Sequence, residues 1–242
     1  GHTAFVLSQQ FQITAGKRGT VEFETPFGGQ ISVLGIRTTP FTNSAGVNTL
    51  TLTTVPALAN VGTNGGSIAH IATGNGWQTT FVLVNTGGTP AQTTLKFFAD
   101  QTGAPLTLPL SFPQSTGGAR TTASSVTRTV APGASLIVQS VAPASDPAPT
   151  TGSAQVTTDG NVGGFVIFRY NPNGQEAVVP LENRTASGFL IAFDNTAGTA
   201  TGIAVNSVSS QTVNVPVTVR DDTGSQIATD TLTLAANAHT SF

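Results

Sequence analysis

An internal repeat limits the folds that this chain can adopt, because the same strand pattern recurs at an offset of 121 residues. Thr80–Asn85 (TFVLVN) lies on Thr201–Asn206 (TGIAVN), and Leu95–Gly103 (LKFFADQTG) lies on Pro216–Gly224 (PVTVRDDTG) without a gap. A sequence that uses one pattern twice predicts two homologous structural units.

The second part of each unit also repeats, but in a different place along the chain. Gly152–Thr158 (GSAQVTT) resembles Gly19–Thr25 (GTVEFET), and Val162–Arg169 (VGGFVIFR) resembles Gln30–Arg37 (QISVLGIR). The counterpart of the middle of the chain therefore lies partly near its beginning and partly near its end.

This arrangement predicts one complete unit and one divided unit. Unit A is expected to be whole over residues 67–182. Unit B is expected to be split in circularly permuted order, with its front half in 183–242 and its back half in 1–58. A Gly- and Asn-rich linker over 59–66 separates the back half of unit B from unit A.

The two ends of the sequence resemble each other. Gly1–Phe5 reads GHTAF and Ala238–Phe242 reads AHTSF. This similarity predicts a super-repeat, of which the chain is one period in a longer array.

The fold class is expected to be all-β. Short alternating segments are separated by Gly, Pro and Asn turns, and no amphipathic helical period lasts three turns. Strands are expected at Ala4–Ile13, at Arg18–Thr25 with Val21 and Phe23 facing inward, and at Gln30–Arg37. The size and turn spacing of each unit predict an immunoglobulin-like β-sandwich without its Cys and Trp core residues.

Composition excludes several classes of function. Charged residues make up 8% of the chain and its formal net charge is −2, so no basic surface for nucleic acid is expected. No apolar run reaches the length of a membrane span. The absence of Cys excludes disulfides, thiol catalysis and thiolate metal sites.

The polar residues indicate neither an enzyme nor a cofactor or metal site. His2, His70 and His239 lack spaced partners, and His70 is expected to stand alone in its strand. The Asp-containing turns lack the further ligands of a calcium loop, the carboxylates are scattered, and no nucleophile elbow occurs. No catalytic, cofactor-binding or metal-binding residue is therefore predicted.

Two smaller features have structural interpretations. Arg169 and Glu176 flank the turn Asn171–Gly174 and are expected to form a cross-strand ion pair, whereas Arg37 has no corresponding Glu. Asn183 begins a glycosylation pattern, and glycans on Asn183 or on exposed Thr and Ser are an alternative to a plain solvated surface.

Four segments resemble a known group of proteins: GNGWQTTFVLVNTG, FRYNPNGQEAVVPLE, FDNTAGTATGIAV and GHTAFVLSQQF. Together they resemble the tandem repeats of large secreted or surface β-proteins of acidobacteria-type bacteria. The resemblance covers nearly the whole chain and implies a β-sandwich architecture and an extracellular or cell-surface location. It implies no activity.

A divided sandwich leaves apolar faces and strand edges open, which predicts assembly. We expect residues 1–58 to complete the 186–242 half of a neighbouring copy, through strand addition or in a continuous tandem polypeptide, and to form a filament or surface array. The alternatives are a closed permutant, an adhesin stalk or weak carbohydrate-binding module, and an accessory domain of a secreted enzyme. The expected assembly interface consists of Phe5, Val6, Leu7, Phe11, Ile13, Val21, Phe23 and Phe242.

Overall fold

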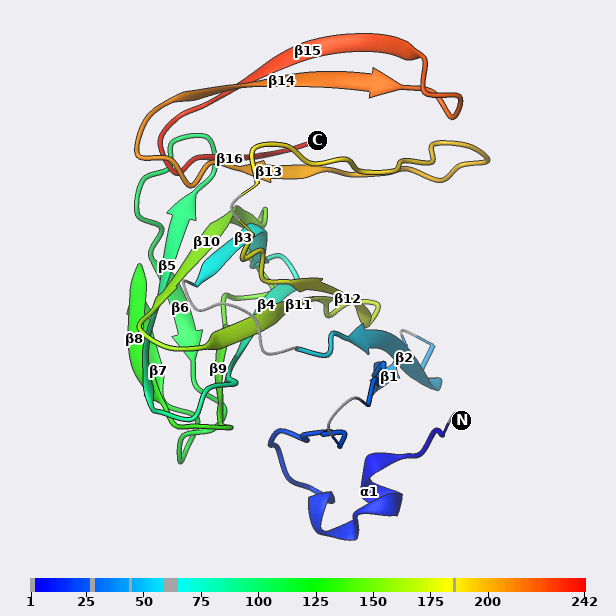
Figure 1. Ribbon diagram of the computed structural model, residues 1–242, viewed down its shortest axis with the longest axis vertical. Helices are drawn as coiled ribbons and strands as arrows, with labels where there is room; N and C mark the ends of the chain where they lie inside the picture. The colour runs from blue at the N-terminus through cyan, green and yellow to red at the C-terminus, as the bar shows by residue number, and fades with distance from the viewer. Residues whose placement is uncertain (1–2, 27–28, 44, 59–64, 185) are drawn as a thin grey trace.

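The computed structural model describes residues 3–26, 29–43, 45–58, 65–184 and 186–242. Strands account for 49% of the chain and helices for 3%, so the predicted all-β class is confirmed. Figure 1 shows a central pair of sheets, with the N-terminal region below it and the C-terminal strands above it.

The first central sheet is antiparallel and contains four strands. In spatial order these are β3 (Gly66–Thr73), β10 (Thr150–Thr158), β5 (Ala91–Ala99) and β8 (Ser125–Val130). Alternate residues of β5, from Ala91 to Phe97, are buried, as expected for a strand with one face on a core.

The second central sheet contains six strands. Their order is β12 (Gln175–Pro180), β11 (Val162–Tyr170), β4 (Trp77–Asn85), β9 (Ser135–Ser140), β6 (Leu108–Ser111) and β7 (Arg120–Ala123). Strand β4 alternates between buried and half-buried residues, so its apolar side chains Phe81 and Leu83 face the first sheet.

The two central sheets enclose one hydrophobic core. The rings of Phe81 on β4 and Phe97 on β5 meet with centroids 5.5 Å apart, and each is only 1% exposed. Burying one such side chain stabilises the fold by about 1.5–3 kcal/mol. All the large apolar residues that are less than 2% exposed lie within residues 67–182. The alternating pattern of this region therefore matches the sheets it forms.

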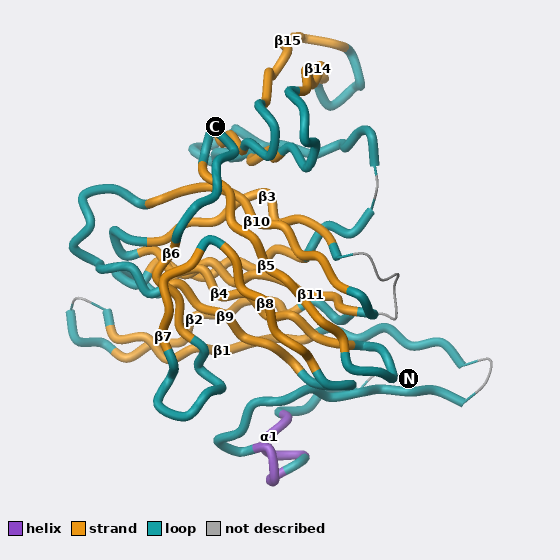
Figure 2. The backbone as a smooth tube through the Cα atoms, turned by 90° about the vertical axis from the view of Figure 1, so that its left-hand side faces the viewer, coloured by secondary structure: helices purple, strands orange, loops and turns teal. Residues whose placement is uncertain are grey.

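The C-terminal region adds two small sheets to one end of this core. Strand β13 (Ala204–Asn206) pairs with β16 (His239–Ser241), and β14 (Val213–Arg220) pairs with β15 (Gln226–Leu234). Both pairs lie on the side of the core that is opposite to the N-terminal helix, as Figures 1 and 2 show.

The N-terminal region contains a hairpin and a short helical segment. Strand β1 (Gly35–Thr42) pairs with β2 (Asn48–Val55), whereas α1 (Leu7–Gln10) and a 3-10 turn (Gln12–Thr14) precede them. The predicted strand over Ala4–Ile13 is therefore wrong. No strand pairs with this segment, and the backbone instead satisfies itself through local bonds such as that from the Gln10 amide to the Val6 carbonyl.

Two further strand predictions fail for the same reason. Arg18–Thr25 is described but forms no strand, and in Gln30–Arg37 only the last three residues, from Gly35, belong to one. The side chains of Val21 and Phe23, expected to face inward, are 45% and 48% exposed. An alternating segment becomes a strand only when a neighbour supplies the hydrogen bonds of the ladder.

The predicted linker lies largely outside the described residues. Of residues 59–66, only Gly65 and Gly66 are described, and Gly66 already begins β3. The predicted turn at Asn171–Gly174 is confirmed, because the Gly174 amide bonds to the Tyr170 carbonyl and Gly174 adopts a φ of 71°.

Candidate functional site

Exposed apolar side chains are concentrated in the two end regions. Among the described residues, 22 large apolar side chains are exposed, and 21 of them lie in residues 1–58 or 183–242. The exception is Val179 on the edge strand β12. Single exposed apolar residues are ordinary in folded proteins, whereas large contiguous apolar patches are typical of protein–protein, membrane or ligand-binding surfaces.

The N-terminal surface contains seven of the predicted interface residues, and all seven are exposed. The rings of Phe5 and Phe11 pack edge to face with centroids 6.0 Å apart, while Ile13 is 75% exposed. The complete group is Phe5, Val6, Leu7, Phe11, Ile13, Val21 and Phe23.

The C-terminal surface contains the eighth predicted residue, Phe242, which is 63% exposed. Its backbone exchanges two hydrogen bonds with Ile203 at the end of the β13–β16 pair. The structure adds a patch that the prediction missed, made of Phe189, Leu190, Ile191 and Phe193. The sequence signal for this patch is the apolar run GFLIAF at residues 188–193.

The two surfaces face away from each other. Figure 1 places α1 and the β1–β2 hairpin at one end of the molecule and β13 to β16 at the other. Within the described ranges, no hydrogen bond or ion pair joins residues 1–58 to residues 183–242. The two predicted halves of unit B are therefore separate within one chain.

Glu176 attaches the N-terminal hairpin to the six-stranded sheet. Its side chain is 1% exposed and its Oε1 atom accepts a 2.8 Å hydrogen bond from Arg169 Nη1, which confirms the predicted cross-strand pair. Arg37, expected to lack an acidic partner, lies 3.6 Å from the same oxygen. The prediction for Arg37 is wrong because its partner comes from another sheet rather than from its own hairpin.

Phe41 strengthens the same attachment by packing against Gly174. A Cβ atom on Gly174 would lie 2.5 Å from the Phe41 ring, so the turn and the hairpin touch closely. Nearby, Trp77 and Tyr170 pack on each other with centroids 5.0 Å apart, and Trp77 also contacts the core. Both side chains are half-buried, and their rings are tilted by 39° rather than coplanar.

A row of three polar side chains attaches the C-terminal region. His239 on β16 is fully buried; its Nδ1 atom lies 3.1 Å from Asp100 Oδ1, and its Nε2 atom lies 3.0 Å from His70 Nδ1 on β3. The expectation that His70 stands alone is wrong. Its partners are distant in sequence, so no local spacing could have indicated them.

With both imidazoles neutral, these contacts allow one assignment of the protons. Asp100 can only accept, so His239 donates from Nδ1 and its Nε2 is left as an acceptor. His70 must then donate from Nδ1. Burial lowers the pKa of both imidazoles, the charge of His239 lowers the pKa of His70 further, and Asp100 opposes both shifts. The contact between His239 and Asp100 is thus a hydrogen bond to a neutral ring rather than an ion pair.

These three groups do not surround a common point. Asp100 and His70 lie on opposite sides of the His239 ring, because they bind its two different nitrogens. No group of three or more His, Asp or Glu residues in the described part of the chain could hold a metal ion. His2 lies outside that part.

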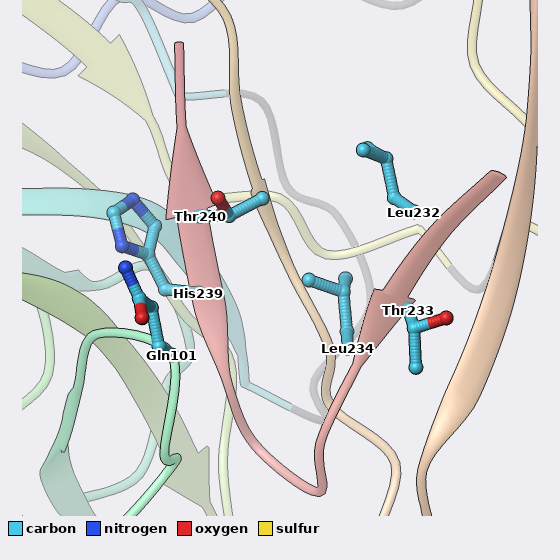
Figure 3. Close-up of a pocket in the computed structure, with 6 residues that line it drawn as sticks. All are labelled: Gln101, Leu232, Thr233, Leu234, His239 and Thr240. Atoms are coloured by element: carbon cyan, nitrogen blue, oxygen red, sulfur yellow. The ribbon is translucent and has the colours of Figure 1, made fainter. Parts of the chain in front are cut away.

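A shallow depression of about 270 Å³ lies beside His239. Figure 3 shows the His239 ring and the Gln101 side chain on one side of β16, with Leu232 and Leu234 on the other. The lining of the depression offers neither a nucleophile with a base nor a carboxylate pair. The lining residues are Gln101, Leu232, Thr233, Leu234, His239 and Thr240.

The described segments contain no helix that is both long and apolar enough to span a bilayer. Asn183 is exposed, but Thr185 of its glycosylation pattern lies outside the described residues. No protein-family model matches this chain, and neither a curated protein nor a solved structure matches it.

Proposed function

We propose that this protein is a structural subunit that assembles head to tail with copies of itself into an extracellular filament or surface array. The observation that carries the proposal is the concentration of exposed apolar side chains in the two end regions, which lie at opposite ends of the molecule. Residues 1–58 of one copy would complete residues 183–242 of the next.

The sheets of unit A supply the template for this contact. Strand β5 lies between β8 and β10, and β4 lies between β9 and β11. In the C-terminal region, the described β14 pairs only with β15 and the described β13 pairs only with β16. Each of these two pairs therefore has an open edge where unit A has a further strand.

Details of the strand pairing support the equivalence of the two units. The Ser207 amide donates to the Ala238 carbonyl as the Asn85 amide donates to the Ala134 carbonyl. The neighbouring turns also correspond, since Asn237 and Gly133 have φ values of 57° and 68°. By this criterion Ser207, rather than Asn206, is the counterpart of Asn85, one residue away from the sequence alignment.

The segments that would fill the open edges are both present in the N-terminal region. Arg18–Thr25 resembles β10, so it would pair with β14 and place Val21 and Phe23 over Val217 and Val219. The last two valines are half-buried on the inner face of β14. Side chains that are exposed on one partner and half-buried on the other would then be buried together.

Gln30–Arg37 resembles β11 and would pair in the same way with β13. The donor segment (residues 1–58) and the acceptor region (residues 183–242) are different surfaces at opposite ends of the molecule. Each added copy therefore leaves one donor segment and one acceptor region open, and the assembly grows without closing into a ring. The extracellular setting rests on the sequence resemblance to secreted repeat proteins. An immunoglobulin-like, circularly permuted unit B is part of the same proposal.

Mixing two single-cysteine variants tests the contact directly, because the natural chain has no Cys. In unit A, Gln155 lies opposite Lys96. With the same one-residue shift that makes Ser207 the counterpart of Asn85, the equivalent pair between copies is Glu22 and Thr218. E22C protein mixed with T218C protein under mild oxidation should form a disulfide-linked heterodimer.

The control replaces T218C with T127C, an equally exposed Thr on β8 of unit A. Cross-linking that is as fast with T127C as with T218C, or a chain that remains monomeric at all concentrations in sedimentation velocity, would refute head-to-tail completion.

A further inference from the structure

The row Asp100–His239–His70 lies where the C-terminal region meets unit A. His70 comes from β3, Asp100 from the turn after β5, and His239 from β16. The Gln101 amide also donates a 2.9 Å hydrogen bond to the His239 carbonyl. The row therefore joins β16 to the four-stranded sheet that contains β3 and β5, a sheet to which β16 does not belong.

The surrounding contacts are close. A Cβ atom on Gly103 would collide with the Ala236 carbonyl oxygen, so the turn after β5 packs directly on the turn before β16. The Gln155 amide side chain donates to Asn237 Oδ1 at 3.0 Å across the same contact. Separation of β16 from unit A would expose all of these groups at once.

We propose that the row is a pH-operated latch, which holds the β13–β16 pair against unit A while at least one of the two imidazoles is neutral and releases it when both are protonated. The proposal does not rest on self-assembly, because it concerns a contact within one chain.

Counting protons gives the reason. With both rings neutral, His70 donates to His239, which donates to Asp100. One added proton can sit on the Nε2 atom of His70, which bonds to none of the described residues, without breaking this row. A second added proton must sit on His239 Nε2, which then faces the N–H of His70 at 3.0 Å and can no longer accept.

No other charged group among the described residues acts on the two rings. Strand β3 contributes His70, β16 contributes His239, and the turn after β5 contributes Asp100. Strand β10 contributes the neutral Thr151, whose hydroxyl donates to Asp100 Oδ2 at 3.2 Å, and β11 contributes the ring of Phe168 beside His70. The charge on the latch is thus set by its own three members.

The direction of the pH effect follows from the lowered pKa of both imidazoles. The released state binds protons more readily than the latched state, so acid favours release. The latch is fully stable above about pH 6.5, the usual value for histidine, and weakens as the pH falls below it. If the released state binds one proton more than the latched state, the equilibrium constant for opening is about 30-fold larger at pH 5.0 than at pH 8.0.

Hydrogen exchange of the Gln101 amide measures this opening, because the amide donates to the His239 carbonyl across the contact. After correction for the intrinsic exchange rate, its protection factor should fall by about 30-fold between pH 8.0 and pH 5.0. The Leu106 amide, which bonds to Phe97 within unit A, is the internal control and should keep its protection.

The variant H70Q separates a latch from general acid sensitivity. Its side-chain amide can donate to neutral His239 or, turned over, accept from protonated His239, so Gln101 protection should hardly change with pH. A second variant, D100N, removes the charge that favours protonated His239 and should shift opening to a different pH while Leu106 stays protected.

Three results would overturn the latch: constant Gln101 protection in the natural chain, an equal acid-dependent loss in H70Q, or a parallel loss at Leu106 in both proteins. If H70Q is unfolded at pH 8.0, the nitrogen resonances of the imidazoles in the natural chain decide. They must show two Nδ1-protonated neutral rings at pH 8.0 and release that coincides with double protonation.

Discussion

The Nε2 atom of His239 lies 3.0 Å from the Nδ1 atom of His70, although 169 residues separate them in the sequence. Each ring is placed by a different sheet, so their contact reports how the C-terminal region sits on unit A.

Overall stability should decrease in mild acid. Both imidazoles have a lowered pKa in the folded chain, so the unfolded chain takes up more protons as the pH falls below about 6.5. The thermal midpoint should be lower at pH 5.0 than at pH 7.5, and the double variant H70Q/H239Q should show a smaller difference. An unchanged pH dependence in the double variant would assign the acid sensitivity to other groups.

The Glu176 side chain should contribute strongly to the free energy of unfolding. Glu176→Ala removes the buried carboxylate and leaves Arg169, whose side chain is only 20% exposed, without its counter-charge. The expected cost is about 3 kcal/mol in the free energy of unfolding, measured by urea titration.

Arg37→Ala is the matched comparison for Glu176→Ala. Arg37 is 40% exposed and lies 3.6 Å from the carboxylate, so its removal should cost less than about 1 kcal/mol. Equal losses for the two variants would mean that Arg37, rather than Arg169, is the main partner.

Gly174→Ala should loosen the β1–β2 hairpin. The new Cβ would press on Phe41 and would also occupy a backbone conformation with a φ of 71°. Gly198→Ala is the control, because Gly198 has a similar φ of 83° but no neighbouring atom within 4 Å. The control should lose about 1 kcal/mol from backbone strain, and Gly174→Ala should lose measurably more in urea unfolding.

Phe23→Asp should weaken self-association without unfolding the chain. Phe23 is 48% exposed in the single copy, so a polar side chain there costs little, whereas burying its charge against Val217 of a neighbour would be costly. Sedimentation velocity should show smaller species than for the natural protein. Val179→Asp, on the edge of unit A, should leave the distribution unchanged; equal loss would point to a different interface.

The sequence by itself determined the all-β class, and the alternating segments of unit A do form strands. In that region each alternating segment has a neighbouring strand within the same chain, so local pattern and final pairing agree, as for Phe81 and Phe97 on facing sheets. The cross-strand pair of Arg169 and Glu176 was equally predictable, since a short turn brings the two residues together.

Only the tertiary structure decided the fate of the end regions and the polar cluster. Arg18–Thr25 alternates as cleanly as any strand of unit A, yet Val21 and Phe23 remain exposed because no neighbouring strand bonds to that segment. His70, Asp100 and His239 meet because three separate elements converge, and a hydrogen bond between groups so far apart leaves no local pattern. The alternating pattern of a segment predicts which of its faces is apolar. The packing of whole sheets determines which residues that face contacts.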